Sequence, residues 1–264
     1  MEVVEASGVR VAFERAGHGP PLVLVHGAAE DHRIWRPQID ALAADFTVVA
    51  WDEPGAGRSS DLPEGFTLAG YADCLAAVVE AASAGPAHLA GLSWGGTVVQ
   101  ELYRRRPDLV ATLVFVDTYA GWKGSLPEPE VRARMDGVRR MLAAPAERFD
   151  PRLPGLFAGE PPQQWLELLE QMQAAVRPAS MRAQLELMAR ADQRDVLASV
   201  EVPTLLVWGA QDVRSPLAVA RQFQRAIAHA ELVVLEGCGH VSNLEAPERF
   251  NAAVRDFCHR HPPA

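Results

Sequence analysis

The sequence has few of the basic side chains that nucleic-acid-binding proteins use. Lys and Arg number 25 against 34 Asp and Glu, so the formal net charge is −9 at pH 7. Affinity for a phosphate backbone requires clustered Lys and Arg, so this balance argues against a nucleic-acid partner. An acidic surface favours solubility and indicates no particular substrate.

Long apolar runs are also absent. None approaches the roughly 18 consecutive apolar residues of a membrane-spanning helix. Charged residues interrupt the first segment, Met1 to Arg15, which therefore lacks the apolar stretch of a secretory signal. No membrane association is expected.

Cysteine is scarce. The three cysteines, Cys74, Cys238 and Cys258, are an odd number without CxxC spacing. This pattern predicts free thiols in a reducing compartment, and so a cytoplasmic protein.

Motifs for metals and organic cofactors are missing as well. The eight histidines form no HExxH or similar zinc pattern. The segment Gly55-Ala56-Gly57 has neither the GxGxxG pattern nor the Gly-Lys-Ser/Thr pattern of phosphate-binding loops, and a tight connection after a buried strand explains its glycines. We therefore expect no cofactor and no metal.

What the sequence does contain is a series of short strand-like segments. Two alternating ones, Glu2–Ala6 and Val9–Arg15, are separated by Ser7-Gly8 and predict a hairpin. The others are almost wholly apolar, as in strands buried on both faces of a parallel sheet: Leu22–Val25, Phe46–Trp51, His88–Leu92, Leu113–Val116, Thr204–Trp208 and Leu232–Leu235. Helical stretches such as Leu68–Ala82 and Thr97–Arg106 lie between them. This alternation predicts an α/β fold with a mostly parallel eight-stranded sheet flanked by helices.

Residues 119–199 break the alternation. They contain no convincing strand but three helical candidates, Glu130–Ala143, Gln163–Val176 and Ala179–Ala191, separated by prolines. One interpretation is an elaborate surface connection. We favour a helical lid over the carboxyl ends of the strands, since long structureless connections are uncommon. The predicted organisation is a core of residues 1–118 and 200–264 with a lid of residues 119–199.

A candidate nucleophile lies between a buried strand and an amphipathic helix. The segment Gly91-Leu92-Ser93-Trp94-Gly95 is a GxSxG motif, and its context matches the sharp strand-to-helix turn that exposes a reactive serine. Small flanking residues are needed because the chain passes close to its neighbours at such a turn. We predict Ser93 as the nucleophile.

A serine needs a base and an orienting acid, in the chain order Ser, Asp or Glu, His. Asp212 follows the predicted strand Thr204–Trp208, and His240 follows Leu232–Leu235. Alone, each is equally well explained as a loop residue. Together they predict a Ser93–Asp212–His240 triad, with Asp117 as a competing acid.

An oxyanion hole requires two backbone donors. Trp94, the residue after the nucleophile, is predicted to supply one N–H, and Ala28 in the loop after the strand Leu22–Val25 the other. His26 is interpreted as a structural residue that ties loops together, with a catalytic base as the alternative. His32 is interpreted as a solvated loop residue, with substrate contact as the alternative.

Substrate contacts are expected from the lid. Trp122, Trp165 and Met181 are the candidates for an apolar pocket, with core or lid packing as the alternative. A lid arginine is a candidate to recognise a substrate carboxylate, and the sequence leaves four open: Arg132, Arg134, Arg139 and Arg182.

These motifs together resemble the α/β-hydrolase superfamily over essentially the whole chain. The blocks that carry the resemblance are His26-Gly27, the segment Asp52–Ser59, the GxSxG motif, Gly209–Asp212 and Gly239-His240. Two stretches, 191–197 and 239–248, are similar to the 3-oxoadipate enol-lactonase-like branch, and similar stretches occur in esterases and carbon–carbon bond hydrolases.

The resemblance implies a serine hydrolase that cleaves a small or medium carboxylic ester or lactone through an acyl-enzyme. Enzymes of this superfamily with an Asp nucleophile are disfavoured, because Ser93 stands at that position. A carbon–carbon bond hydrolase and a cofactor-free perhydrolase of the haloperoxidase type remain as alternatives. A non-catalytic small-molecule receptor of the same fold is the rival from another class.

Overall fold

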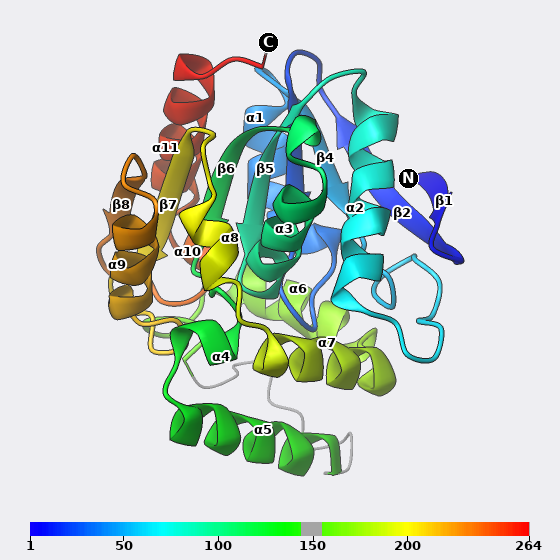
Figure 1. Ribbon diagram of the computed structural model, residues 1–264, viewed down its shortest axis with the longest axis vertical. Coiled ribbons are helices and arrows are strands. Elements are labelled where there is room, and N and C mark those ends of the chain that lie inside the picture. The colour runs from blue at the N-terminus through cyan, green and yellow to red at the C-terminus, as the bar shows by residue number, and fades with distance from the viewer. Residues whose placement is uncertain (144–154, 264) are drawn as a thin grey trace.

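The computed structural model describes residues 1–143 and 155–263, and one sheet organises them (Figure 1). Its strand order is β1-β2-β4-β3-β5-β6-β7-β8. The strands are β1 (Glu2–Ala6), β2 (Val9–Ala16), β3 (Pro21–Val25), β4 (Thr47–Trp51), β5 (Ala87–Leu92), β6 (Val110–Val116), β7 (Thr204–Gly209) and β8 (Glu231–Leu235). The predicted eight-stranded sheet is confirmed.

Strand direction follows the sequence pattern. The alternating strands β1 and β2 pair as an antiparallel hairpin, and β2 also runs antiparallel to β4. From β4 to β8 all neighbours are parallel. Central strands β5 and β7 are buried at every position, which explains their uninterrupted apolar composition.

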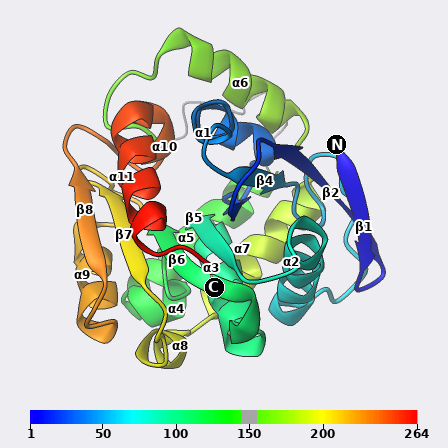
Figure 2. The same cartoon turned by 90° about the horizontal axis from the view of Figure 1, so that it is seen from above.

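Helices cover both faces of the sheet, as Figure 2 shows from above. On one face lie α2 (Leu68–Ala82), α3 (Trp94–Arg105), α8 (Arg194–Ala198) and α9 (Leu217–Ala226); on the other lie α1 (Arg36–Leu42), α10 (Ser242–Glu245) and α11 (Pro247–Arg260). Short 3-10 turns occur at His32–Trp35 and Pro107–Leu109. Each face buries its own apolar cluster. Among the described helices, none has the length and apolar character that crossing a membrane requires.

Four further helices gather at one end of the sheet (Figure 1): α4 (Trp122–Ser125), α5 (Glu128–Ala143), α6 (Gln163–Ala174) and α7 (Pro178–Arg190). All lie within the segment predicted as a lid. Helix α8 lies in the same predicted segment but packs against α3 and α9 on the face of the sheet. Pro145, Pro151 and Pro154 of the predicted lid lie outside the described residues. The division into core and lid stays a prediction.

The parallel strands place their following loops at one edge of the sheet. Ser93 follows β5, Asp212 follows β7 and His240 follows β8. Strands that run in one direction end at the same edge, so residues far apart in the sequence meet there. The four helices from α4 to α7 lie at this edge.

An aromatic cluster anchors α9 to the sheet and provides a test of the core. The Phe223 ring is fully buried, with its centroid 5.2 Å from that of Phe115 and 5.9 Å from that of Trp208. We expect Phe223→Ala to lower the free energy of unfolding by about 3–5 kcal/mol, since the ring leaves a cavity. Urea denaturation measures the change. Arg221→Ala, on the exposed side of the same helix, is the matched control, and an equal loss in both variants would contradict the packing described.

Candidate active site

The turn at Ser93 holds the nucleophile in a rare backbone conformation. Ser93 has φ 51° and ψ −117°, so a non-glycine residue occupies a region that costs of order 1–3 kcal/mol. Two contacts hold it there: the Ser93 N–H donates to the Val116 carbonyl at 3.0 Å, and the Thr118 hydroxyl donates to the Ser93 carbonyl. The end of β6 and Thr118 just after it thus hold the backbone of the turn in place.

The glycines that follow Ser93 are required by close approach of the backbone. A Cβ atom on Gly95 would lie 2.3 Å from the Val25 carbonyl oxygen at the end of β3. On Gly96 it would lie 2.2 Å from Thr118 Oγ1. Helix α3 can therefore start directly against β3 and β6 only with glycine at these positions.

Ser93, Asp212 and His240 meet at the carboxyl edge of the sheet. The His240 Nε2 atom lies 2.9 Å from Ser93 Oγ, and its Nδ1 atom lies 2.8 Å from Asp212 Oδ2. Asp212 Oδ1 accepts the backbone N–H groups of Arg214 at 2.8 Å and Ser215 at 2.9 Å. With its proton on Nδ1, the imidazole donates to Asp212 and presents Nε2 as an acceptor for the Ser93 hydroxyl. This geometry is what general-base activation of a serine requires.

Asp117, the competing acid, lies among other partners. Its carboxylate accepts the Gly209 N–H at 2.8 Å and the Ser242 hydroxyl at 2.6 Å. Burial raises the pKa of Asp117 well above its ordinary value, and the nearby charge of Asp212 acts in the same direction. Asp117 ties the loops after β6, β7 and β8 together, whereas Asp212 contacts the imidazole.

Two backbone N–H groups beside Ser93 have no hydrogen-bond partner among the described residues: those of Ala28 and Trp94. Ala28 lines the same cavity as Ser93. The neighbouring Gly27 N–H, by contrast, already donates to Glu30 Oε2 at 2.8 Å. The two positions predicted for the oxyanion hole therefore keep their donors available.

His26 lies beneath this loop and is fully buried. Its Nε2 atom accepts the Glu53 N–H at 3.1 Å, and its Nδ1 atom lies 2.8 Å from the Gly27 carbonyl oxygen. Burial lowers the pKa of His26, which favours the neutral ring. The histidine thus bridges the loops after β3 and β4, as the structural interpretation expects.

The buried Glu53 carboxyl joins the nucleophile turn to helix α7. It accepts the Trp94 indole N–H at 2.6 Å and the Gln184 amide N–H at 2.6 Å. Burial raises the pKa of Glu53 well above its ordinary value. This role of Glu53 could not be predicted from the sequence, because a glutamate in a loop normally indicates solvent exposure.

A cavity of about 370 Å³ opens above Ser93 and His240. Its apolar wall includes Trp122, Val138, Met181, Leu185 and Met188, and its polar groups include Glu30, Tyr119, Arg134 and Arg214. A mainly apolar pocket with a few polar groups is typical of sites for small organic molecules.

The predicted substrate residues divide between the cavity and its surroundings. Trp122 and Met181 line it. Trp165 does not lie among the described lining residues. It is partly buried and packs against the apolar cluster that contains Leu169 and Met172 of the same helix, and of these three residues of α6 it is Leu169 that lines the cavity.

Of the four arginines of the predicted lid that the sequence left open, Arg134 is the one among the described lining residues. Its guanidinium donates to the Tyr119 hydroxyl at 2.9 Å, to the Arg214 carbonyl at 2.6 Å and to Glu130 at 2.6 Å. It also lies over the Trp122 ring, 5.5 Å from its centroid. These contacts hold the cation against the cavity wall.

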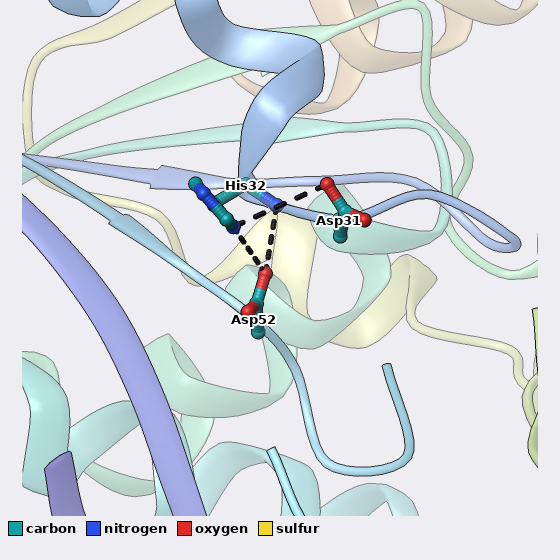
Figure 3. A group of neighbouring side chains, drawn as sticks. All are labelled: Asp31, His32 and Asp52. Carbon is teal, nitrogen blue, oxygen red and sulfur yellow. Dashed lines mark hydrogen bonds and ion pairs between the residues drawn. The ribbon is translucent and has the colours of Figure 1, made fainter. Parts of the chain in front are cut away.

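Asp31, His32 and Asp52 form a cluster, and Figure 3 shows how their side chains face one another. Asp52 Oδ1 lies 2.6 Å from the His32 ring nitrogen Nδ1 and accepts the His32 backbone N–H at 2.9 Å. Asp31 accepts two hydrogen bonds from the Arg33 guanidinium, at 2.7 and 2.9 Å. Ligand atoms with these spacings can hold a cation, but each already has a protein partner. The cluster joins the loops after β3 and β4, so His32 is not the solvated loop residue that we expected.

Electrostatics agree with this structural role of Asp52. Burial alone would raise the pKa of the Asp52 carboxyl, but hydrogen bonds and charge from His32, together with the Arg58 N–H, hold the pKa below its ordinary value. The carboxylate is therefore charged and satisfied by the protein itself.

Comparison with known proteins agrees with this architecture. The model of the α/β-hydrolase fold family matches residues 20–247. The (E)-2-((N-methylformamido)methylene)succinate hydrolase of Acinetobacter baylyi is 28% identical over an alignment of 258 residues that covers 95% of this chain and 94% of that protein. A thermophilic esterase from Thermogutta terrifontis has a TM-score of 0.83 and 28% identity, covering 99% of this chain and 100% of its own. The enol-lactonase from Burkholderia xenovorans LB400, at 23% identity, TM-score 0.79 and coverage of 98% and 100%, shares the fold.

The chain belongs to the α/β-hydrolase fold family. This membership and the hydrolases among its relatives support an enzyme that acts on ester bonds.

The raised pKa of Glu53 predicts a pH-dependent stability. A carboxyl that binds its proton more tightly in the folded state than in the unfolded state loses folding free energy as the pH rises above the ordinary glutamate range. Glu53→Gln removes the ionisation and retains an oxygen that accepts the Trp94 N–H. We expect its stability relative to the wild type to grow from pH 5 to pH 9, measured by urea unfolding. The exposed Glu64→Gln is the control, and a constant difference across pH for Glu53→Gln would contradict the burial described.

Proposed function

We propose that the protein is a serine hydrolase that cleaves small or medium carboxylic esters or lactones through an acyl-enzyme. The observation that carries the proposal is the contact of His240 with Ser93 at 2.9 Å and with Asp212 at 2.8 Å, at the floor of the cavity. The esterase relatives support a carboxylic ester as the reacting bond.

The proposed reaction begins with general-base catalysis. His240 takes the hydroxyl proton of Ser93 while Oγ attacks the carbonyl carbon, and Asp212 stabilises the resulting imidazolium. The tetrahedral oxyanion accepts the N–H groups of Ala28 and Trp94. Collapse of the intermediate transfers the proton from His240 to the departing alkoxide, which leaves the acyl group on Ser93.

Deacylation repeats the same steps with water as the nucleophile. His240 deprotonates the water, the oxyanion forms again on the same two donors, and Ser93 recovers its proton. A lactone follows this route with its alcohol still tethered to the acyl chain. No step in this scheme draws on a metal or an organic cofactor.

The cavity supports a substrate of modest size. About 370 Å³ accommodates a small or medium organic molecule, and the side chains of Trp122, Met181, Leu185 and Met188 present an apolar wall to the acyl or alcohol group.

The triad proposal predicts distinct effects of two buried aspartates. Asp212→Asn should lower kcat about 10⁴-fold, because the imidazole loses the partner that selects its tautomer. Asp117→Asn keeps the Asp212–His240 contact, so it should retain most of the activity per folded molecule and mainly lose stability. Turnover of p-nitrophenyl esters, with urea unfolding on the same preparations, measures both. A near-normal rate for Asp212→Asn with an inactive Asp117→Asn would move the acid to Asp117.

Covalent labelling tests the nucleophile directly. A fluorophosphonate probe should modify Ser93 in the wild type, and Ser93→Ala should neither label nor turn over ester. Simple esters, simple lactones and one vinylogous diketone should be compared as substrates. Cleavage of the diketone alone would favour a carbon–carbon bond hydrolase, and a native protein that fails to label would overturn the serine-hydrolase proposal.

The two lid tryptophans form a matched pair for the substrate pocket. Trp122→Ala removes an aromatic wall of the cavity and should raise KM for a medium-chain ester roughly tenfold, the loss of about 1.4 kcal/mol of binding. Trp165→Ala removes a ring of similar size outside the lining and should leave KM near the wild-type value. Steady-state kinetics on an ester series checks this, and equal effects of both substitutions would contradict the assignment of Trp122 to the pocket.

A further inference from the structure

One carboxyl group lies beside the reacting centre without a part in the scheme above. Glu30 is in the loop after β3, and its Oε2 atom accepts the Gly27 N–H at 2.8 Å. Its side chain lines the cavity together with Ser93 and His240. Gly27 lies between this carboxyl and the nucleophile. A Cβ atom built on Gly27 would lie 2.9 Å from Glu30 Oε2 and 3.3 Å from Ser93 Cβ, so the gap between the two residues has room for little more than one methyl group.

The hydrogen bond from Gly27 decides which backbone groups remain for the oxyanion. Because the Gly27 N–H is taken by Glu30, the donor offered by this loop is the N–H of Ala28. The loop bends sharply at the next residue, Ala29, whose φ is 64°. Glu30 thus holds the loop in the shape that the proposed oxyanion hole needs. It also places an ionisable carboxyl group close to that oxyanion hole.

The charged groups around Glu30 come from several elements. Arg214, from the loop after β7, favours its ionised form; Asp31, from its own loop, disfavours it. Glu53, from the loop after β4, lies close enough for the two carboxyls to affect each other. His240 and Arg134 line the same cavity.

Among these effects burial is the largest. It raises the pKa of Glu30 to about 7, although the Gly27 N–H and Arg214 oppose it. The carboxyl is therefore mostly neutral in mildly acidic solution and mostly charged in mildly alkaline solution. Most surface glutamates are charged throughout this range.

We propose that Glu30 controls the rate of hydrolysis through its protonation state, with the neutral carboxyl permitting the reaction and the ionised carboxyl suppressing it. The inference rests on the serine-hydrolase function proposed above and adds a positioning residue to it.

The physical reason is the charge that develops during attack on the carbonyl. The Ser93 proton moves to His240, and one negative charge appears on the carbonyl oxygen next to Ala28 and Trp94. When Glu30 is neutral, the charge on the carbonyl oxygen has no negative charge on Glu30 to repel it. With ionised Glu30 a second negative charge faces it across a few ångströms of protein, which raises the energy of the intermediate. Glu30 itself gives and takes no proton in this step.

The test is the pH dependence of kcat/KM for p-nitrophenyl butyrate between pH 5.5 and 9.5. For the wild type we expect a loss of roughly ten- to a hundredfold above pH 7, the size of the repulsion between two unit charges roughly 6–10 Å apart at an effective dielectric constant of about 20. Glu30→Gln keeps the size of the side chain and an oxygen for the Gly27 N–H but cannot ionise, so its kcat/KM should stay level on the alkaline side. The exposed Glu236→Gln is the matched control and should follow the wild type.

A second variant, Glu30→Ala, keeps the test valid if Glu30→Gln does not fold. Glu30→Ala also removes the charge, and it should likewise lack the alkaline loss even if its overall rate falls because the loop is less well held. The proposal is overturned if both variants keep the wild-type alkaline loss, or if their rates drop equally at every pH with no change in the profile.

Failure of this inference is distinguishable from failure of the proposed function. An enzyme that labels at Ser93 and loses activity in Ser93→Ala, yet shows the same alkaline loss without Glu30, contradicts the inference alone. A protein that does not label at Ser93 contradicts both.

Discussion

The site depends on how closely helix α3 approaches the ends of β3 and β6. The chain must turn from strand to helix within one residue. This turn forces Ser93 into a backbone conformation that residues other than glycine rarely adopt. Gly95 and Gly96 remove the side chains that would collide with Val25 and Thr118. If the helix started further away, the Trp94 N–H and Ser93 Oγ would move together away from Ala28 and His240.

Much of this arrangement was predictable, because it depends on local patterns. The apolar runs predicted the strands, and the chain order of Ser93, Asp212 and His240 matched their meeting at one sheet edge. Helices α9 and α11, whose patterns are amphipathic, were not among the helices predicted. Short helices such as α4 and α8 are stabilised by packing more than by helix propensity, so their sequences alone give little signal. Trp165 shows the same limit: its position in a predicted lid helix did not reveal which face of that helix meets the cavity.

Three carboxyls near the nucleophile could not be predicted, of which Glu53 and Asp117 are fully buried and Glu30 is partly buried. Glu30, Glu53 and Asp117 each look like ordinary loop residues in the sequence, yet each accepts a hydrogen bond from a group that shapes the site. In all three, burial raises the pKa. A charged residue type in a loop indicates solvent exposure by default, and only the three-dimensional packing shows that these three are enclosed. Glu30 and Glu53 also lie close enough that a proton bound at one affects the other, whereas the carboxyl that affects Asp117 is Asp212.

The bond between Gln184 and Glu53 has a consequence for redesign of the cavity. Met181, Leu185 and Met188 share one face of α7 with Gln184, at helical spacings of three and four residues. This face of α7 therefore has two roles. It forms a wall of the pocket, and it is linked to the indole of Trp94 by the hydrogen bonds that Glu53 accepts from Gln184 and Trp94. A library intended to admit bulkier acyl groups should therefore reduce side-chain size at the three apolar positions, which are also part of the core, and keep Gln184 constant as the anchor of the helix.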